Sequence, residues 1–393
     1  MNDPASTLID KSWITLHSHY EAGQYKKAEE MARGLINDDP TDRNAWKILA
    51  AIAAQRGRYT EAVQAWETIV NLSPDDQLAR YNLGVALQAS ARFDEAKSSY
   101  VEAIALNPKY EQAHYNLGIL LFESRQYFLA SNHFEKTDVH NSALFRLKCA
   151  FFLDDEKTFY KKFDALVNQG HLNAVLGSLA SRSSLKNQTK IANPFCDAPL
   201  RYISVDDLTE SYDFESIFRR TAIETLADLS TVYRTQRYLS NGRQTAGNIF
   251  SLERVKDSGI ADIIRLEIDK YRSKFINPKE GFLKYWPDKY EIRGWLVSMK
   301  AGGSLTAHMH DSGWVTGCIY INVPSGLQND SGNLVLCLDH GESASAMGEN
   351  NKQVINVKTG TLCLFPSSLF HYTVPFTAEE DRIVLAFDAI PQT

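Results

Sequence analysis

The sequence predicts an α + β protein with two parts: an N-terminal, all-α helical solenoid, followed by a β-sandwich or jelly-roll barrel with buttressing helices. Small and aromatic residues recur at one fixed period through the first 140 positions, which is typical of stacked helix pairs. After Glu291, short β-branched and aromatic segments alternate with turn residues, which is typical of a sandwich or barrel. The 393 residues are enough for two or three domains with separate cores.

The helical part keeps a step of 34 residues at several independent positions. The members of this series are Pro40, Pro74 and Pro108; Tyr25, Tyr59, Phe93 and Tyr127; Ala28, Ala62, Ala96 and Ala130; Trp66, Tyr100 and Phe134; and Leu49, Leu83 and Leu117. Small residues where helices touch, aromatic residues between them and a proline closing each unit are typical of tetratricopeptide repeats. We expect about four repeats within residues 9–140.

The repeat register fades after His140, although residues 141–190 still contain amphipathic segments. A solenoid needs an atypical last unit to cover its apolar end, so we interpret residues 141–190 as a helical cap and linker. The concave face of such a solenoid is suited to binding a protein or peptide. The alternatives are that the repeats form a homo-oligomer or pack on the second domain.

The second domain is expected to span residues 193–393. Residues 214–226 and 259–271 have helical patterns and would buttress one face of the sheet. Strand patterns dominate after Glu291, with turns predicted at Gly302-Gly303, at 324–326, at 329–332 and at 358–360.

Three histidines and an arginine in this domain have a spacing that favours a metal site. Side chains alternate between the faces of a strand, so His308 and His310 would project from one face. His371 follows a turn at the end of another predicted strand, and Arg382 opens the next one. Arg382 would share its face with the small residues Val384 and Ala386, which predicts a cation inside the barrel. A buried guanidinium needs an anionic partner, and a bound carboxylate would serve.

The chain resembles the Fe(II)/2-oxoglutarate-dependent dioxygenases, and more narrowly the oxygenases of this type that follow tetratricopeptide repeats on one chain. The residues that carry the resemblance are Gly294-Trp295-Leu296-Val297, Gly302-Gly303, His308-Met309-His310, residues 313–320, Gly360-Thr361-Leu362, Phe365-Pro366-Ser367, His371 and Arg382. The resemblance implies a double-stranded β-helix that holds Fe(II) on His308, His310 and His371. It also implies that 2-oxoglutarate binds with its distal carboxylate on Arg382, and that a C–H bond of the substrate is hydroxylated. A peptide-binding solenoid before such a domain favours a protein, peptide or carrier-bound substrate. The alternative is a small-metabolite oxygenase whose repeats serve assembly.

Two positions depart from the pattern of the resembled family. His310 stands where most members have an Asp or Glu ligand, so three histidines bind the iron, a carboxylate from elsewhere completes the set, or water or an anion takes that position. Asp311 is adjacent but would point to the opposite face. Val384 stands where many members have a serine that helps to hold 2-oxoglutarate; Tyr320 or Ser298 could supply this hydroxyl.

These departures keep two other functions open. One is a catalytically inactive scaffold with a degenerate barrel. The other is a three-histidine, cupin-type dioxygenase that binds its substrate on the metal and does not use 2-oxoglutarate. Arg382 weighs against the second alternative, since its most natural use is to bind the cosubstrate.

Composition excludes several other classes. A net charge of −6 without a basic tract argues against nucleic acid as the main partner. The five cysteines have no Cys-x-x-Cys spacing, which indicates reduced thiols. No targeting segment or stretch of membrane-spanning length is recognisable, so no membrane partner is expected and we predict a cytoplasmic protein.

Overall fold

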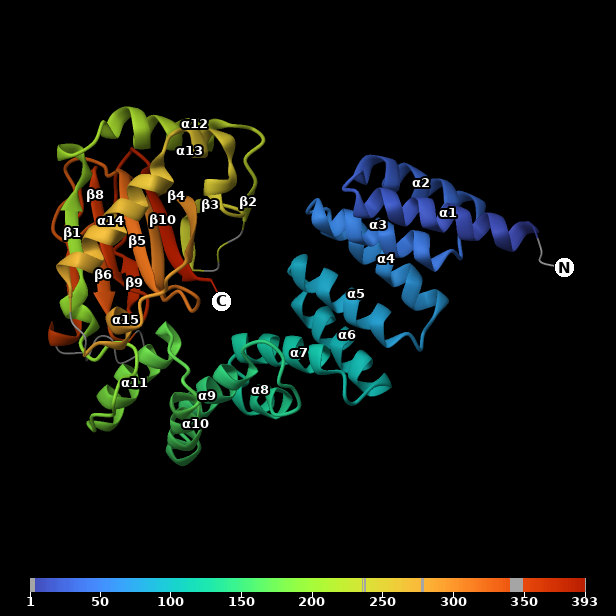
Figure 1. The fold of residues 1–393 in the computed structure, drawn as a ribbon, viewed down its shortest axis with the longest axis horizontal. Helices are drawn as coiled ribbons and strands as arrows, with labels where there is room; N and C mark the ends of the chain where they lie inside the picture. The colour runs from blue at the N-terminus through green and yellow to red at the C-terminus, as the bar shows by residue number, and fades with distance from the viewer. Residues whose placement is uncertain (1–3, 235, 237, 277–278, 340–348, 393) are drawn as a thin grey trace. The chain divides into compact units, whose positions relative to one another are not determined.

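The computed structural model describes residues 4–234, 236, 238–276, 279–339 and 349–392. The chain forms two compact units, Met1–Lys162 and Phe163–Thr393 (Figure 1). Within the part of the chain that is described, no helix combines the length and the apolar character needed to cross a membrane.

The first unit is a series of helices that pack as consecutive pairs, as the 34-residue period predicts. Its helices are α1 (Pro4–Glu21), α2 (Tyr25–Asp38), α3 (Arg43–Gln55), α4 (Tyr59–Leu72), α5 (Gln77–Ala89), α6 (Phe93–Leu106), α7 (Glu111–Glu123), α8 (Tyr127–Phe134) and α9 (Ser142–Phe152). Helix α10 (Glu156–Asn168) includes the division in the chain between the two units, after Lys162. The predicted helical solenoid is confirmed.

Close packing between helices explains the small residues of the repeat. The four alanines at the shared position, Ala28 to Ala130, are completely buried. A Cβ atom on Gly84 would lie 2.6 Å from the ring of Tyr100, and one on Gly118 would lie 2.9 Å from the ring of Phe134. Both glycines therefore let an aromatic ring of the following helix approach the backbone.

The prolines that close the repeats also have a shared contact. The carbonyl of each accepts a hydrogen bond from a side chain six residues later, although the donor differs in type between repeats. The pairs are Trp46 Nε1 to Pro40, Arg80 Nε to Pro74 and His114 Nε2 to Pro108, at 3.0, 2.8 and 3.1 Å. The repeat thus conserves a hydrogen bond while the residue that makes it varies.

The second unit combines helices with antiparallel strands. Its helices are α11 (Ala174–Asn187), α12 (Thr221–Ala227), α13 (Glu253–Asp257), α14 (Ile260–Lys274) and α15 (Gly281–Lys284), with the shorter η1 (Pro199–Tyr202), η2 (Leu208–Glu210), η3 (Glu215–Arg220), η4 (Ile249–Ser251) and η6 (Glu349–Asn351). Its strands are β1 (Ser204–Asp207), β2 (Tyr233–Arg234), β3 (Leu239–Thr245), β4 (Tyr290–His308), β5 (Val315–Asn322), β6 (Leu334–Cys337), β7 (Lys352–Ile355), β8 (Thr361–Pro366), β9 (Phe370–Thr373) and β10 (Arg382–Pro391).

The strands form one antiparallel sheet that curves as a half-barrel, in the order β1-β8-β5-β10-β4-β9-β6-β7, with β3 pairing β4 and β2 pairing β3. Strand β4 belongs to two parts of it, because its first half pairs with β10 and its last residues pair with β9. The turn predicted at Gly302-Gly303 is wrong, since β4 continues through both residues. Gly302 has a φ of +75°, and a Cβ on Gly303 would meet the Lys300 carbonyl at 2.6 Å, so the glycines bend the strand without ending it.

The two faces of the sheet have different neighbours. Helix α14 lies across one face (Figure 1), where Ile264 and Ile268 share a core with Leu385 and Phe387 of β10. The predicted buttressing helices are therefore present. The alternate residues of β10 lie on the inner face, together with Cys318 and Tyr320 of β5.

Helix α11 belongs to the second compact unit. A Cβ atom on Gly177 would lie 2.7 Å from that of Phe195, so the helix packs closely on the segment that follows it. The domain boundaries expected from the sequence, including a linker near residue 190, stay a prediction.

Candidate metal and cosubstrate site

The structure brings the three predicted histidines together on the inner face of the sheet. His308 ends β4 and is paired in register with His371 of β9. Directly opposite residues of an antiparallel pair point to the same face, which explains why their ring centroids are 4.3 Å apart. The ring of His310 lies 5.3 Å from His308 and 4.8 Å from His371. One potential ligand atom from each lies within 4.8 Å of the others, which suits a single metal ion.

His310 reaches this cluster by a different route from the predicted one. Strand β4 ends at His308, so His310 lies in the segment that leads into the next turn and is not placed by strand alternation. Asp311 follows it in that turn and is exposed.

The hydrogen bonds of the histidine rings fit metal binding. Nδ1 of His308 lies 2.9 Å from the carbonyl oxygen of Thr306, and Nδ1 of His310 lies 2.7 Å from Oδ1 of Asp388. Because carbonyl and carboxylate oxygens accept, these contacts assign the proton to Nδ1 in both rings. In the neutral form of each ring, Nε2 is then the atom with a free lone pair that a metal requires.

The third histidine is kept neutral by its surroundings. Burial, and then the neighbouring His308 and His310, hold the pKa of His371 well below its usual value. A neutral imidazole can donate its lone pair to a metal, whereas a protonated one cannot.

Asp388 is the residue of this site that the sequence analysis missed. It lies on β10, six residues after Arg382, and is 5% exposed. Besides His310, its Oδ1 accepts a hydrogen bond of 2.8 Å from the Thr316 hydroxyl, which is itself 2.8 Å from the hydroxyl of Ser367. Asp388 interrupts an apolar strand pattern, and that interruption was the available signal.

Arg382 lies inside the half-barrel, as its strand pattern predicted. It is 1% exposed, and its Nε donates to the Gly332 carbonyl at 3.0 Å. Its Nη2 is buried and has no hydrogen-bond partner, and no carboxylate of the described residues pairs with it. Burial lowers the pKa of this guanidinium. The position is therefore that of a cation whose anionic partner is to come from a ligand.

The two candidate hydroxyl residues differ in position. Tyr320 is buried on the inner face, with the guanidinium of Arg382 4.9 Å from its ring centroid. Ser298 is paired with Ile383, which faces the helices, and its hydroxyl donates to Asp381 at 3.0 Å. The suggestion that Ser298 holds the cosubstrate is therefore wrong, because strand alternation turns it away from the cavity.

A row of paired residues crosses the inner face at this level. In register from β2 to β5 it contains Arg234, Gln244, Val297, Val384 and Tyr320. With the three histidines and Arg382, the last four of these line a cavity of about 460 Å³ including its open mouth. The guanidinium of Arg234 lies 5.7 Å from the ring of Trp295, which meets His310 edge-on at 5.2 Å. The cavity thus opens directly beside the histidine cluster.

Comparison with protein families agrees with the two parts of the chain. The family described as "Putative 2OG-Fe(II) oxygenase" matches residues 293–388, a range that begins on β4 and ends at Asp388. The families described as "Tetratricopeptide repeat" and "TPR repeat" match residues 16–77 and 92–124. Among curated proteins, none matches the chain.

Several solved structures are similar to part of the chain. They include MamA (20% identity, 39% of this chain and 95% of that chain, TM-score 0.35) and Pseudomonas aeruginosa PilF (18%, 46% and 84%, 0.38). A tetratricopeptide repeat protein from Parabacteroides merdae ATCC 43184 has 15% identity over 46% of this chain and 75% of that chain, with a TM-score of 0.40. Likenesses at this level carry no functional argument. The family matches therefore show tetratricopeptide repeats within residues 16–124 of this chain and a domain of the "Putative 2OG-Fe(II) oxygenase" family at residues 293–388.

Proposed function

We propose that the C-terminal domain is an Fe(II)/2-oxoglutarate-dependent dioxygenase that hydroxylates a protein, peptide or carrier-bound substrate. The observation that carries this proposal is the buried Arg382, which no carboxylate of the described residues pairs with, in the same cavity as three converging histidines. A three-histidine oxygenase without cosubstrate has no use for this cation. In an inactive scaffold, the buried guanidinium would destabilise the fold without serving any ligand.

The strand order supports a double-stranded β-helix as the finer description of this half-barrel. In this description, strands β8, β5, β10 and the first half of β4 would make one layer, and the end of β4 with β9, β6 and β7 would make the other. The histidines come from the second layer and its entry, and Arg382 comes from the first. We extend the oxygenase domain to residues 193–393, because the helices that cover the outer face precede residue 293.

His308, His310 and His371 would hold the iron, and the donor set fits this ion because imidazole nitrogen is a ligand that iron accepts. With iron and 2-oxoglutarate bound, the centre supplies the O2-dependent oxidation of a C–H bond. Arg382 binds the distal carboxylate of the cosubstrate, and Tyr320 packs against that guanidinium. Val297, Val384 and Ala386 are among the apolar residues that also line the cavity, and they would limit the access of water to it.

The repeats would recruit the substrate. A solenoid that binds a peptide raises the effective concentration of that peptide at an attached active site. Self-association through the repeats is the alternative use.

The cofactor chemistry is tested by anaerobic titration of the Fe(II)-loaded protein with 2-oxoglutarate, following the visible metal-to-ligand charge-transfer band. We expect the band in the wild type and its loss in Arg382→Ala and His371→Ala. Metal binding without a band would favour the three-histidine oxygenase, and no metal binding would favour the scaffold.

Recruitment is tested by removing residues 1–162, which form a separate compact unit. We expect 2-oxoglutarate binding to persist and turnover of the macromolecular substrate to fall. Full activity of the shortened chain on a small molecule would contradict recruitment.

A further inference from the structure

We propose that Asp388 is a positioning residue for the metal site. Through its hydrogen bond to His310, it supplies the negative charge that a carboxylate ligand at position 310 would bring to the metal. This inference rests on the proposed function, since it concerns the same metal site. It addresses the departure noted in the sequence, where a histidine occupies the position of a carboxylate ligand.

The contact between the two residues has the geometry of a charge-assisted hydrogen bond. Nδ1 of His310 and Oδ1 of Asp388 are 2.7 Å apart, and both side chains are largely buried, at 13% and 7% exposure. A carboxylate that accepts from one ring nitrogen fixes the ring and makes the other nitrogen a stronger metal ligand. The carboxylate of Asp388 would therefore influence the metal through the imidazole of His310 and not by direct coordination.

A second observation is that no Lys or Arg of the described residues forms an ion pair with Asp388. Its side-chain contacts are the imidazole of His310 and the hydroxyl of Thr316. Arg293, its register partner on β4, is exposed and bonds to Glu291 instead. A buried carboxylate without a counter-charge is costly. A divalent metal bound to the far side of His310 provides that counter-charge.

The surroundings hold Asp388 in this position. The hydroxyl of Thr316 donates to Asp388, so the hydroxyl of Ser367 is the donor in its contact with Thr316. A Cβ on Gly313 would lie 2.5 Å from the Ser367 Oγ and 3.1 Å from Oδ1 of Asp388. The glycine thus lets the turn after His310 close over this network, which orders the carboxylate before any metal binds.

The charge of the centre explains why this arrangement is useful. Three neutral histidines leave the full charge of the divalent ion uncompensated by protein ligands. Asp388 lowers the net charge of the assembly by one unit without occupying a coordination position. A ligand set of this kind would leave room on the metal for a cosubstrate.

The test measures the affinity of the full-length protein for Co(II) by calorimetry and by the visible absorption of the bound ion, for wild type and Asp388→Asn. Asparagine keeps the shape and an accepting oxygen but removes the charge. We expect the dissociation constant to rise by about 10- to 100-fold and the visible bands to shift. The unfolding temperature of the metal-free protein should not fall, whereas its increase on adding metal should shrink.

The matched control is Glu280→Gln, another buried carboxylate that accepts from neutral donors, the amide of Asp197 and the hydroxyl of Tyr202. It should leave Co(II) affinity unchanged. If Asp388→Asn does not fold, Thr316→Val, which removes the donor that orients Asp388, should still weaken Co(II) binding several-fold.

Two results would overturn the inference. One is wild-type Co(II) affinity in Asp388→Asn, or in Thr316→Val where that variant is used. The other is a lower unfolding temperature of the metal-free variant with an unchanged metal-induced increase, which would show a structural role only. The proposed function fails separately, if 2-oxoglutarate produces no charge-transfer band in the wild type.

Discussion

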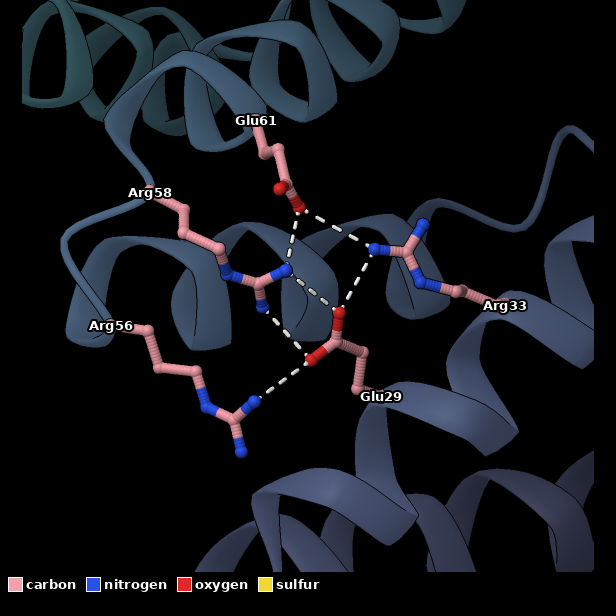
Figure 2. A network of polar contacts seen from close by, with 5 residues as sticks. All are labelled: Glu29, Arg33, Arg56, Arg58 and Glu61. Atoms are coloured by element: carbon pink, nitrogen blue, oxygen red, sulfur yellow. Dashed lines mark hydrogen bonds and ion pairs between the residues drawn. The ribbon is translucent and has the colours of Figure 1, made fainter.

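Arginine side chains are used in two opposite ways in the two compact units. In the solenoid, Glu29 receives hydrogen bonds or ion pairs from Arg33, Arg56 and Arg58, and Glu61 lies within reach of Arg33 and Arg58 (Figure 2). Each of these three guanidiniums has a carboxylate within 3.4 Å. In the half-barrel, Arg382 is buried and no carboxylate of the described residues pairs with it.

The surroundings shift the pKa values of Arg58 and Arg382 in opposite directions. The hydrogen bond to Glu29 raises the pKa of Arg58, whereas burial lowers that of Arg382. A charge that serves folding is balanced within the chain. A charge left unbalanced in a cavity indicates that a ligand balances it.

The largest expected effect comes from Arg382→Met, which removes the charge while keeping an unbranched side chain. We expect 2-oxoglutarate binding to weaken by about 100-fold or more, because the distal carboxylate would be buried without its partner. The free energy of unfolding of the ligand-free protein should stay the same or rise, since an unpaired buried cation is lost. Cosubstrate titration and chemical denaturation measure the two quantities.

Unchanged cosubstrate affinity in Arg382→Met would contradict a role of Arg382 in ligand binding. A loss of stability of the ligand-free protein as large as that from losing a packed core residue would show that Arg382 serves folding instead. The matched control is the substitution Arg58→Met in the solenoid, which should not change 2-oxoglutarate binding.

Histidines extend the comparison, because a pair in the solenoid bonds to each other. Nδ1 of His114 lies 2.9 Å from Nδ1 of His133, and burial followed by the charge of His114 lowers the pKa of His133 to about 4. An unfolded imidazole titrates near pH 6.5, so below that pH the unfolded chain binds a proton that the folded one does not. Stability should be full above about pH 6.5 and fall by about 1–3 kcal/mol as the pH approaches 4.

Denaturation of the wild type and His133→Gln across this pH range checks the prediction. The variant should have the smaller loss between pH 6.5 and 4. Equal losses in both proteins would assign the acid sensitivity to other groups.

The smallest expected effect is that of Glu29→Gln, which leaves three arginines around a neutral side chain. Hydrogen bonding to Arg58 is the main reason that the pKa of Glu29 is lowered. Since the arginines are between 30% and 52% exposed, solvent screens much of the interaction. We expect a loss of about 1 kcal/mol in the stability of the repeats, smaller at high salt, with no effect on the metal site. A loss independent of salt would show that packing, not charge, is the cause.

The sequence by itself determined the architecture of the solenoid and singled out four residues that meet in one cavity of the second unit. The 34-residue period was sufficient, because each repeat packs mainly on its neighbours in the chain. The sequence was also sufficient to single out His308, His310, His371 and Arg382, because their residue types and their positions in predicted strands indicate a metal and carboxylate site.

Only the tertiary structure decided how these residues meet. The register between β4 and β9 sets His308 opposite His371, and the bend at Gly302 sends the end of β4 to that strand. The contact of His310 with Asp388 joins positions 78 residues apart, and no local pattern encodes it. Strand pairing depends on which faces of distant strands are buried together, and not on local sequence. The sequence therefore indicated the histidines and the arginine of the site, but not the carboxylate that bonds to His310.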